Sequence, residues 1–106
     1  MNPKLIRSHD ALMKAFAVAE MVISALPEPP YSVDIDSGIP YAVRLYFHNA
    51  PHLVADFANR NSADVTTRQP FDGSESRVYT ESVIVIDGVT VRAWALTDVA
   101  PKAVAA

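Results

Sequence analysis

Residues 79–96 read YTESVIVIDGVTVRAWAL, and this stretch decides the fold. Two runs rich in β-branched residues flank Asp87-Gly88, a pair that readily adopts the two positive φ angles of a type I′ turn. A two-residue turn fixes the register of a hairpin, because it pairs the residue before the turn with the residue after it. The sequence therefore predicts an antiparallel hairpin with Ile86 opposite Val89.

This register sorts the side chains of the hairpin onto two faces. One face is small and apolar, which suits packing against helices. Its members are Thr80, Ser82, Ile84, Ile86, Val89, Val91, Ala93 and Ala95. The other face also carries many apolar side chains, although the exposed face of such a sheet is normally polar. Its members are Tyr79, Glu81, Val83, Val85, Thr90, Arg92, Trp94 and Leu96.

A second hairpin is predicted upstream. Apolar and polar residues alternate at 31–36 and at 41–48, around a break at 38–40. Alternation of this kind is typical of half-buried strands. Matching the apolar faces sets Asp34 opposite Arg44 on the other face. The apolar pairs are Tyr31 with Phe47, Val33 with Leu45, and Ile35 with Val43.

Helical spacing predicts one helix over residues 9–26 and another from Ala50 to about Asn59. Pro27 ends the first helix, and Asn49 is the expected N-cap of the second, with Pro51 in its first turn. Residues 63–69 favour a short strand and 70–76 an exposed loop. The expected buried stripe of the first helix is Leu12, Ala15, Phe16, Ala19, Val22, Ile23 and Leu26.

The element order α-β-β-α-β-β-β predicts the α+β class. We expect a two-layer sandwich, with an antiparallel sheet of four to five strands and two helices on one face. Residues 1–106 are expected to form a single domain, with residues 1–8 and 99–106 as flexible termini.

Composition excludes several function classes. The chain has 106 residues, half of them apolar, no Cys and a net charge of −3. A disulfide framework, thiolate zinc sites and cysteine nucleophiles are excluded, and the net charge disfavours general binding to nucleic acid. Lys14 and Glu20 interrupt the apolar run at 11–26, so we expect neither a membrane span nor a signal peptide and place the protein in the cytoplasm.

The apolar face of the last hairpin is the most informative functional feature. An apolar patch on a soluble domain marks a contact surface, and a homodimer is the simplest partner arrangement. The alternative is that a helix or loop of the same chain covers this face. The predicted partner-binding residues are Tyr79, Val83, Val85, Arg92, Trp94 and Leu96.

The same face offers an alternative function. Arg44, Arg68 and Arg92 beside Tyr46 and Trp94 resemble a surface that stacks single-stranded bases. Three carboxylates on that face would repel phosphates. For binding of nucleic acid or a small ligand, the candidate residues are Arg44, Tyr46 and His48.

A metal site or an enzyme is a weaker interpretation. His48, His52 and Asp56 are spaced four apart, but Pro51 interrupts their helical phase, so we predict no metal site. Asp34 and Asp36 with His48 could serve acid/base chemistry, yet no nucleophile or phosphate-binding motif is present. We therefore expect a protein that is not an enzyme and needs no cofactor, with a flat patch in place of a deep pocket.

Three segments carry a resemblance: FHNAPHLVADFA at 47–58, VTTR at 65–68 and IDGVTVRAWAL at 86–96. On these segments the chain resembles small α+β proteins encoded by high-GC actinobacteria and their phages. The resemblance covers about half of the chain and implies an accessory protein, with no catalytic residues to carry over.

Overall fold

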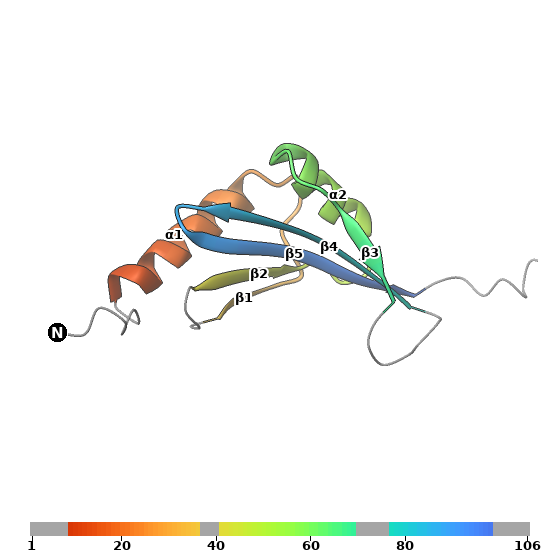
Figure 1. The fold of residues 1–106 in the computed structure, drawn as a ribbon, viewed down its shortest axis with the longest axis horizontal. Coiled ribbons are helices and arrows are strands. Elements are labelled where there is room, and N and C mark those ends of the chain that lie inside the picture. Colours follow the sequence, from red (N-terminus) through yellow and green to blue (C-terminus); the bar gives the residue numbers. More distant parts are fainter. Residues whose placement is uncertain (1–8, 37–40, 70–76, 99–106) are drawn as a thin grey trace, which may run out of the picture.

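The computed structural model describes residues 9–36, 41–69 and 77–98, and its elements follow the predicted order (Figure 1). The α+β class, with two helices on one face of a five-stranded sheet, is confirmed. The expected flexible termini, the break at 38–40 and the loop at 70–76 lie outside the described residues. The elements are α1 (His9–Ser24), β1 (Ser32–Asp36), β2 (Ala42–Tyr46), α2 (Pro51–Arg60), β3 (Thr66–Arg68), β4 (Arg77–Ile86) and β5 (Val89–Asp98).

The β4–β5 hairpin has the predicted register along its whole length. Ile86 pairs with Val89, and the pairing continues to Arg77 opposite Asp98. Asp87 and Gly88 have φ angles of 52° and 79°, as a type I′ turn requires. The turn chemistry therefore assigns each side chain of these two strands to its face.

Gly88 provides a direct test of this turn. A Cβ built at Gly88 would meet nothing within 4 Å, so the cost of a side chain there is purely conformational. We expect Gly88→Ala to lower the free energy of unfolding by about 1 kcal/mol, measured by urea denaturation. Asp87→Asn is the control and should be nearly neutral, because Asn tolerates a positive φ. Equal stability of Gly88→Ala and the parent protein would contradict the turn assignment.

The strand order is β1-β2-β5-β4-β3, and the expectation of a wholly antiparallel sheet is wrong at one pair. Strands β2 and β5 are parallel, with Tyr46 beside Trp94 and Arg44 beside Arg92. The connection explains the direction: α2 carries the chain from the end of β2 to β3 at the far edge. The antiparallel pairs β3–β4 and β4–β5 then reverse the chain twice, which brings β5 alongside β2 in the same direction.

The other hairpin, β1–β2, keeps its predicted register within the strands. Val33 pairs with Leu45, Ile35 with Val43, and Asp34 with Arg44. Strand β1 lies at the sheet edge, while α1 packs mainly over β2 and β5. Val33 is therefore 45% exposed although it shares the helix-covered face with buried Leu45.

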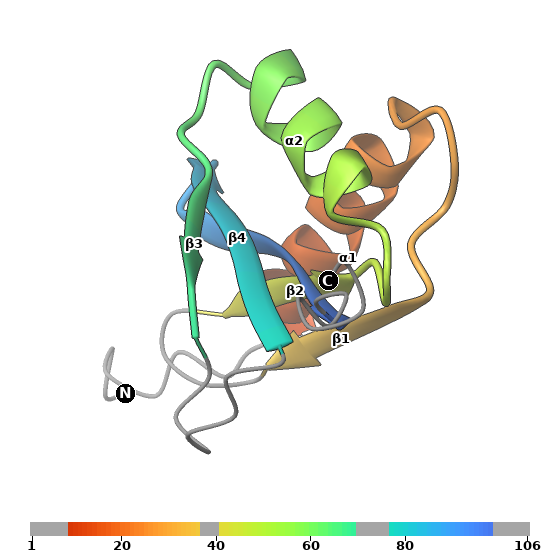
Figure 2. The same cartoon turned by 90° about the vertical axis from the view of Figure 1, so that its right-hand side faces the viewer.

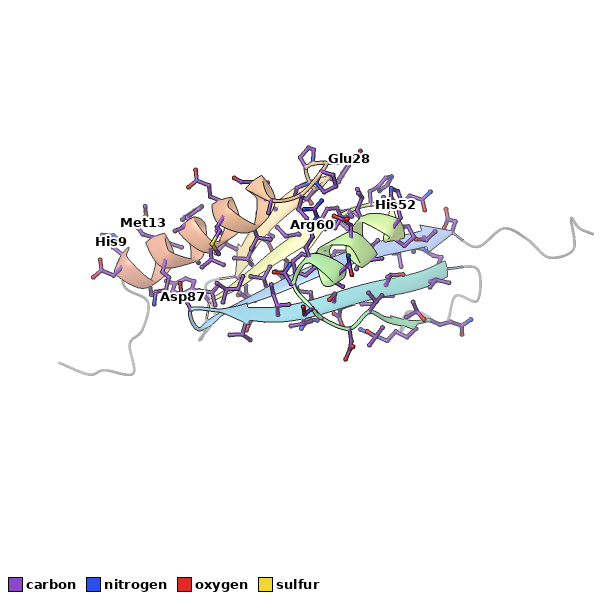
Figure 3. All side chains as sticks on the ribbon, turned by 90° about the horizontal axis from the view of Figure 1, so that it is seen from above. His9, Met13, Glu28, His52, Arg60 and Asp87 are labelled. Atoms are coloured by element: carbon purple, nitrogen blue, oxygen red, sulfur yellow. The ribbon has the colours of Figure 1, made fainter. Side chains whose placement is uncertain are left out.

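Both helices lie across the same face of the sheet when seen from above (Figure 3). Helix α1 buries Ala15, Val18, Ala19 and Val22, whereas Phe16 is 51% exposed. The prediction that Phe16 is buried is wrong, because the buried stripe is centred on Ala15, Val18, Ala19 and Val22 and Phe16 lies beside it on the helix surface. Val18 belongs to that stripe and was missing from the predicted set.

Helix α2 starts at Pro51, with Ala50 as its N-cap and no capping side chain. The predicted cap Asn49 is therefore wrong. Proline at the first helical position stabilises the start without a cap, because its fixed φ suits the helix and it has no N–H to satisfy. The buried side of α2 is formed by Leu53, Val54, Phe57 and Ala58.

The core lies between the helices and the alternate side chains of β2 and β5. Phe57, Leu45, Val43, Val54 and Val91 are fully buried. Ser82 is also buried, and its Oγ has no hydrogen-bond partner in the described part of the chain. None of the helices in the described ranges is long and apolar enough to cross a membrane.

Ser82 leads to a stability prediction. Burial of a hydroxyl without a hydrogen bond is unfavourable, so Ser82→Ala should raise the free energy of unfolding by about 1 kcal/mol. Ser32→Ala on exposed β1 is the matched control and should change little. Urea denaturation of the two variants measures the difference, and a loss of stability in Ser82→Ala would contradict the burial of an unpaired hydroxyl.

Candidate functional site

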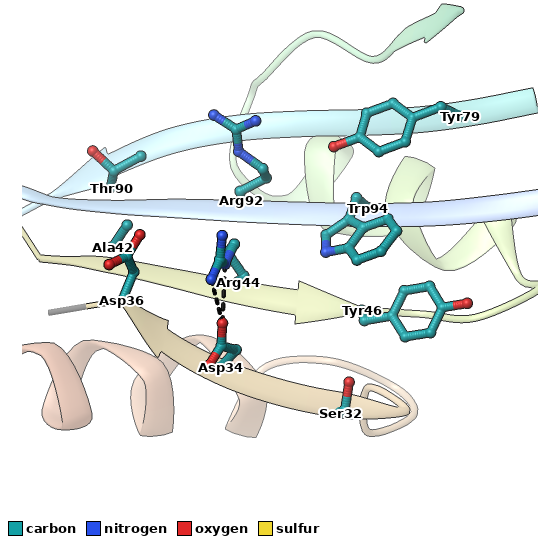
Figure 4. Close-up of a pocket in the computed structure, with 10 residues that line it drawn as sticks. All are labelled: Ser32, Asp34, Asp36, Ala42, Arg44, Tyr46, Tyr79, Thr90, Arg92 and Trp94. Carbon is teal, nitrogen blue, oxygen red and sulfur yellow. Dashed lines mark hydrogen bonds and ion pairs between the residues drawn. The ribbon is translucent and has the colours of Figure 1, made fainter. Parts of the chain in front are cut away.

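The side of the sheet opposite the helices, here called the open face, contains a hollow of about 600 Å³ (Figure 4). The hollow lies over β1, β2 and β5 and reaches β4 at Tyr79. The expected surface was a flat patch, but the twist of a sheet makes part of its surface concave. Its lining residues are Ser32, Asp34, Asp36, Ala42, Arg44, Tyr46, Tyr79, Thr90, Arg92 and Trp94.

Three aromatic rings cross the open face at one end of the hollow. The parallel register brings Tyr46 beside Trp94, with ring centroids 4.3 Å apart, and Tyr79 lies 5.6 Å from Trp94 on the other side. Figure 4 shows the rings of Tyr79 and Trp94 broadside, so each turns a flat face toward the open side. Trp94 is half-buried, and its ring lies between those of Tyr46 and Tyr79.

The row of rings is extended at both ends. The guanidinium of Arg68 lies 4.5 Å from the centroid of the Tyr79 ring. At the other end, the ring of Tyr31 stacks on His48 at 4.8 Å, and Tyr46 Oη lies 3.2 Å from His48 Nδ1. The six side chains thus form a continuous band across the sheet.

Tyr31 corrects one detail of the predicted hairpin, in which it shares the helix-covered face with Phe47. Tyr31 is 71% exposed and lies just before β1. Its ring turns to His48, whose φ of 56° marks a left-handed turn directly after β2. Side chains alternate between the two faces of a sheet only within a strand. Tyr31 lies outside β1, so its ring need not lie on the helix-covered face.

Two ion pairs lie on the open face. Arg44, Asp34 and Arg92 line the hollow, whereas Glu81, the partner of Arg92, does not. Arg44 pairs with Asp34, whose Oδ2 also accepts a hydrogen bond of 3.1 Å from Arg44 Nε. Arg92 donates to Glu81 Oε2 at 2.6 Å. The hydrogen bond to Asp34 is the main cause of a raised pKa for Arg44, which stays charged. The two arginines lie side by side on β2 and β5, yet each is neutralised by its own carboxylate.

Tyr79 joins the aromatic row to the second ion pair. Its hydroxyl donates to Glu81 Oε2 at 2.8 Å, and the Glu81 side chain is only 15% exposed. Burial of the phenol and, next, its hydrogen bond to Glu81 raise the pKa of Tyr79 above the ordinary 10.0. The hydroxyl therefore stays protonated and keeps its position as a donor.

This pKa has a consequence for stability. Because the folded pKa is raised, the unfolded chain loses the Tyr79 proton at lower pH than the folded protein does. The contribution of Tyr79 is thus fully present below pH 10.0 and is lost as pH rises through the folded pKa. Phenolate absorbance of the parent protein minus that of Tyr79→Phe should titrate with a midpoint above 10.0. A midpoint at or below the ordinary value would contradict the buried hydrogen bond.

The predicted partner-binding residues all lie on the open face, but in two groups. Tyr79, Arg92 and Trp94 line the hollow, whereas Val83 and Val85 lie further along β4, 40% and 65% exposed. Leu96 is half-buried opposite Tyr79. The two valines do not line the hollow, although Val83 lies opposite Arg92 and Val85 opposite Thr90 in the register of β4 and β5.

The residues considered for metal or acid/base chemistry are not brought together. Asp34 and Asp36 line the hollow, but His48 does not. Asp56 accepts a 2.6 Å hydrogen bond from Arg60 Nε on α2, and His52 is exposed on the same helix. Within residues 9–36, 41–69 and 77–98, no group of three or more His, Asp and Glu side chains could hold a metal ion.

Comparison with models of protein families, with curated proteins and with solved structures found no match to this chain. The function therefore has to be argued from the surfaces themselves.

Proposed function

We propose that this protein is a small non-catalytic interaction protein that acts in the cytoplasm and binds a second copy of itself through β4. The observation that carries the proposal is the exposure of Val83 and Val85 on a part of β4 that has a free edge. Isolated exposed valines are ordinary, but two of them on one strand face form an apolar stripe.

The free edge follows from the length of β3. Its three residues pair with Tyr79, Thr80 and Glu81 of β4 and extend no further. Along residues 82–86, β4 has β5 on one side and no strand of the described chain on the other. Alternate residues of such a segment leave backbone N–H and C=O groups free to pair with another strand.

The chemistry of this segment suits a second copy as the occupant. Residues 82–86 read SVIVI, with four β-branched apolar residues and no charge to repel an identical strand. Antiparallel pairing of two such segments across a two-fold axis would continue the sheet from one copy into the other. A groove of about 450 Å³ beside the edge, lined partly by Ala63, Val83 and Ile84, leaves room for the added strand.

The alternative functions have less support. For nucleic acid, the two central arginines of the open face are already paired with carboxylates, so the face offers little net positive charge to a phosphate backbone. For an enzyme, Asp34 and Asp36 lie apart from His48 and share no hollow with it. A proposed relationship to accessory proteins of actinobacteria and their phages is compatible with a self-associating protein.

The test is the oligomeric state of Val85→Glu. The two-fold axis repeats the introduced carboxylate in both paired strands, and a charged side chain on an edge strand disfavours pairing, so the dimer dissociation constant should rise by at least about tenfold. Analytical ultracentrifugation over a concentration series measures this constant, and circular dichroism confirms that the variant remains folded. Val33→Glu, on the opposite edge strand and of similar exposure to Val83, is the matched control and should leave the dimer intact.

Two results would contradict the proposal. One is a parent protein that stays monomeric at the highest concentration. The other is a dimer that Val33→Glu dissociates and Val85→Glu does not, which would move the interface to β1.

A further inference from the structure

The proposed self-association through β4 does not use the hollow of the open face. The hollow lies over β1, β2 and β5, and neither Val83 nor Val85 lines it, although both valines lie beside it in the sheet. Its volume of about 600 Å³ falls in the range typical of sites for small ligands. Strand pairing at β4 would leave the hollow open in each copy, so this inference does not rest on the proposed dimer.

One end of the hollow is lined by three aromatic rings, here called the platform, which overlap as tilted and stacked neighbours. Tyr46, Trp94 and Tyr79 come from three adjacent strands, and the rings of Trp94 and Tyr79 face the open side. The ring–ring contacts at 4.3 Å and 5.6 Å hold the platform in place before any ligand arrives. A platform of this kind packs against a flat ligand surface made of C–H groups or of another ring.

The rest of the hollow is polar but electrically balanced. Arg44 is paired with Asp34, and Arg92 with Glu81, so donors and acceptors stand next to each other with little net charge. Asp36 adds a further carboxylate at the lining, while Ser32 and Thr90 add hydroxyls. Such a surface offers both hydrogen-bond donors and acceptors, and it does not select strongly for an anion.

We propose that the hollow binds a neutral saccharide. A pyranose ring has one flat face of C–H groups, which suits the platform of Tyr46, Trp94 and Tyr79. Its hydroxyls each donate and accept, which suits the guanidiniums of Arg44 and Arg92 and the carboxylate of Asp34 at the lining of the hollow. A phosphate-bearing ligand would meet guanidiniums that are already paired with carboxylates, so it fits the hollow less well.

The chain offers a clean probe, because Trp94 is its single tryptophan. Titration of the full chain with cellobiose, maltose and lactose should shift the Trp94 fluorescence in a saturable way for at least one of them. The expected dissociation constant is about 1 mM, as befits an open site. Adenosine monophosphate and inorganic phosphate serve as anionic ligands and should bind more weakly than that disaccharide.

Variants assign the binding to the hollow. Tyr46→Ala removes part of the platform and keeps the fluorophore, and it should weaken saccharide binding at least about tenfold. Thr90→Val removes a lining hydroxyl with little change of shape, and should weaken binding measurably even if Tyr46→Ala fails to fold. Phe16→Ala, on the solvent side of α1, is the control and should bind like the parent protein.

The inference would be overturned by any of three results. These are no saturable shift with any of the three disaccharides, tighter binding of adenosine monophosphate than of the saccharides, or a saccharide affinity that Tyr46→Ala and Thr90→Val both leave unchanged.

Discussion

The register of the β4–β5 hairpin is the constraint on which the rest of the structure depends. Asp87 and Gly88 adopt positive φ angles in a two-residue turn, and this sets which side chains of two ten-residue strands face the helices. A shift by one residue would turn Val91 and Ala93 outward and bury Arg92 and Trp94 instead. Such a shift would remove the core and the open-face site together.

Strand β5 positions the side chains of the open-face site. It is the central strand, antiparallel to β4 and parallel to β2, so its side chains lie between those of both neighbours. Trp94 therefore touches Tyr46 on one side and Tyr79 on the other, and Arg92 lies between Arg44 and Val83. The parallel β2–β5 pair is thus the contact that brings the two hairpins into one surface.

Local sequence signals predicted what local interactions determine. Both hairpin registers, the pairing of Asp34 with Arg44 and the division of β4 and β5 into two faces follow from alternation and turn chemistry. The parallel direction of β2 and β5 follows from the path of the chain through α2 and β3, which short-range patterns do not encode. The sequence predicts Tyr46 and Trp94 on one face beside Arg68, but the ring contacts themselves depend on the parallel pair.

Residues at the ends of elements were the least predictable. Tyr31 and His48 lie just outside β1 and β2, where a left-handed turn at His48 replaces strand alternation. Phe16 fits the helical spacing of apolar residues, but the buried stripe of α1 is centred on Ala15 and Ala19 and leaves Phe16 at its margin. The orientation of the helix on the sheet decides such cases, and the hydrophobicity of a residue alone does not predict it.

The central claim is that β5 presents Trp94 to the open face and Val91 to the core. Paramagnetic relaxation by a soluble gadolinium chelate tests it directly, because the chelate broadens NMR signals of groups near the surface. The account predicts strong broadening of the Trp94 indole signals on the side facing the hollow and little effect on the methyl groups of Val91 and Val54, which are 0% exposed. A protected Trp94 together with broadened Val91 methyls would show that the two faces of the sheet have been assigned the wrong way round.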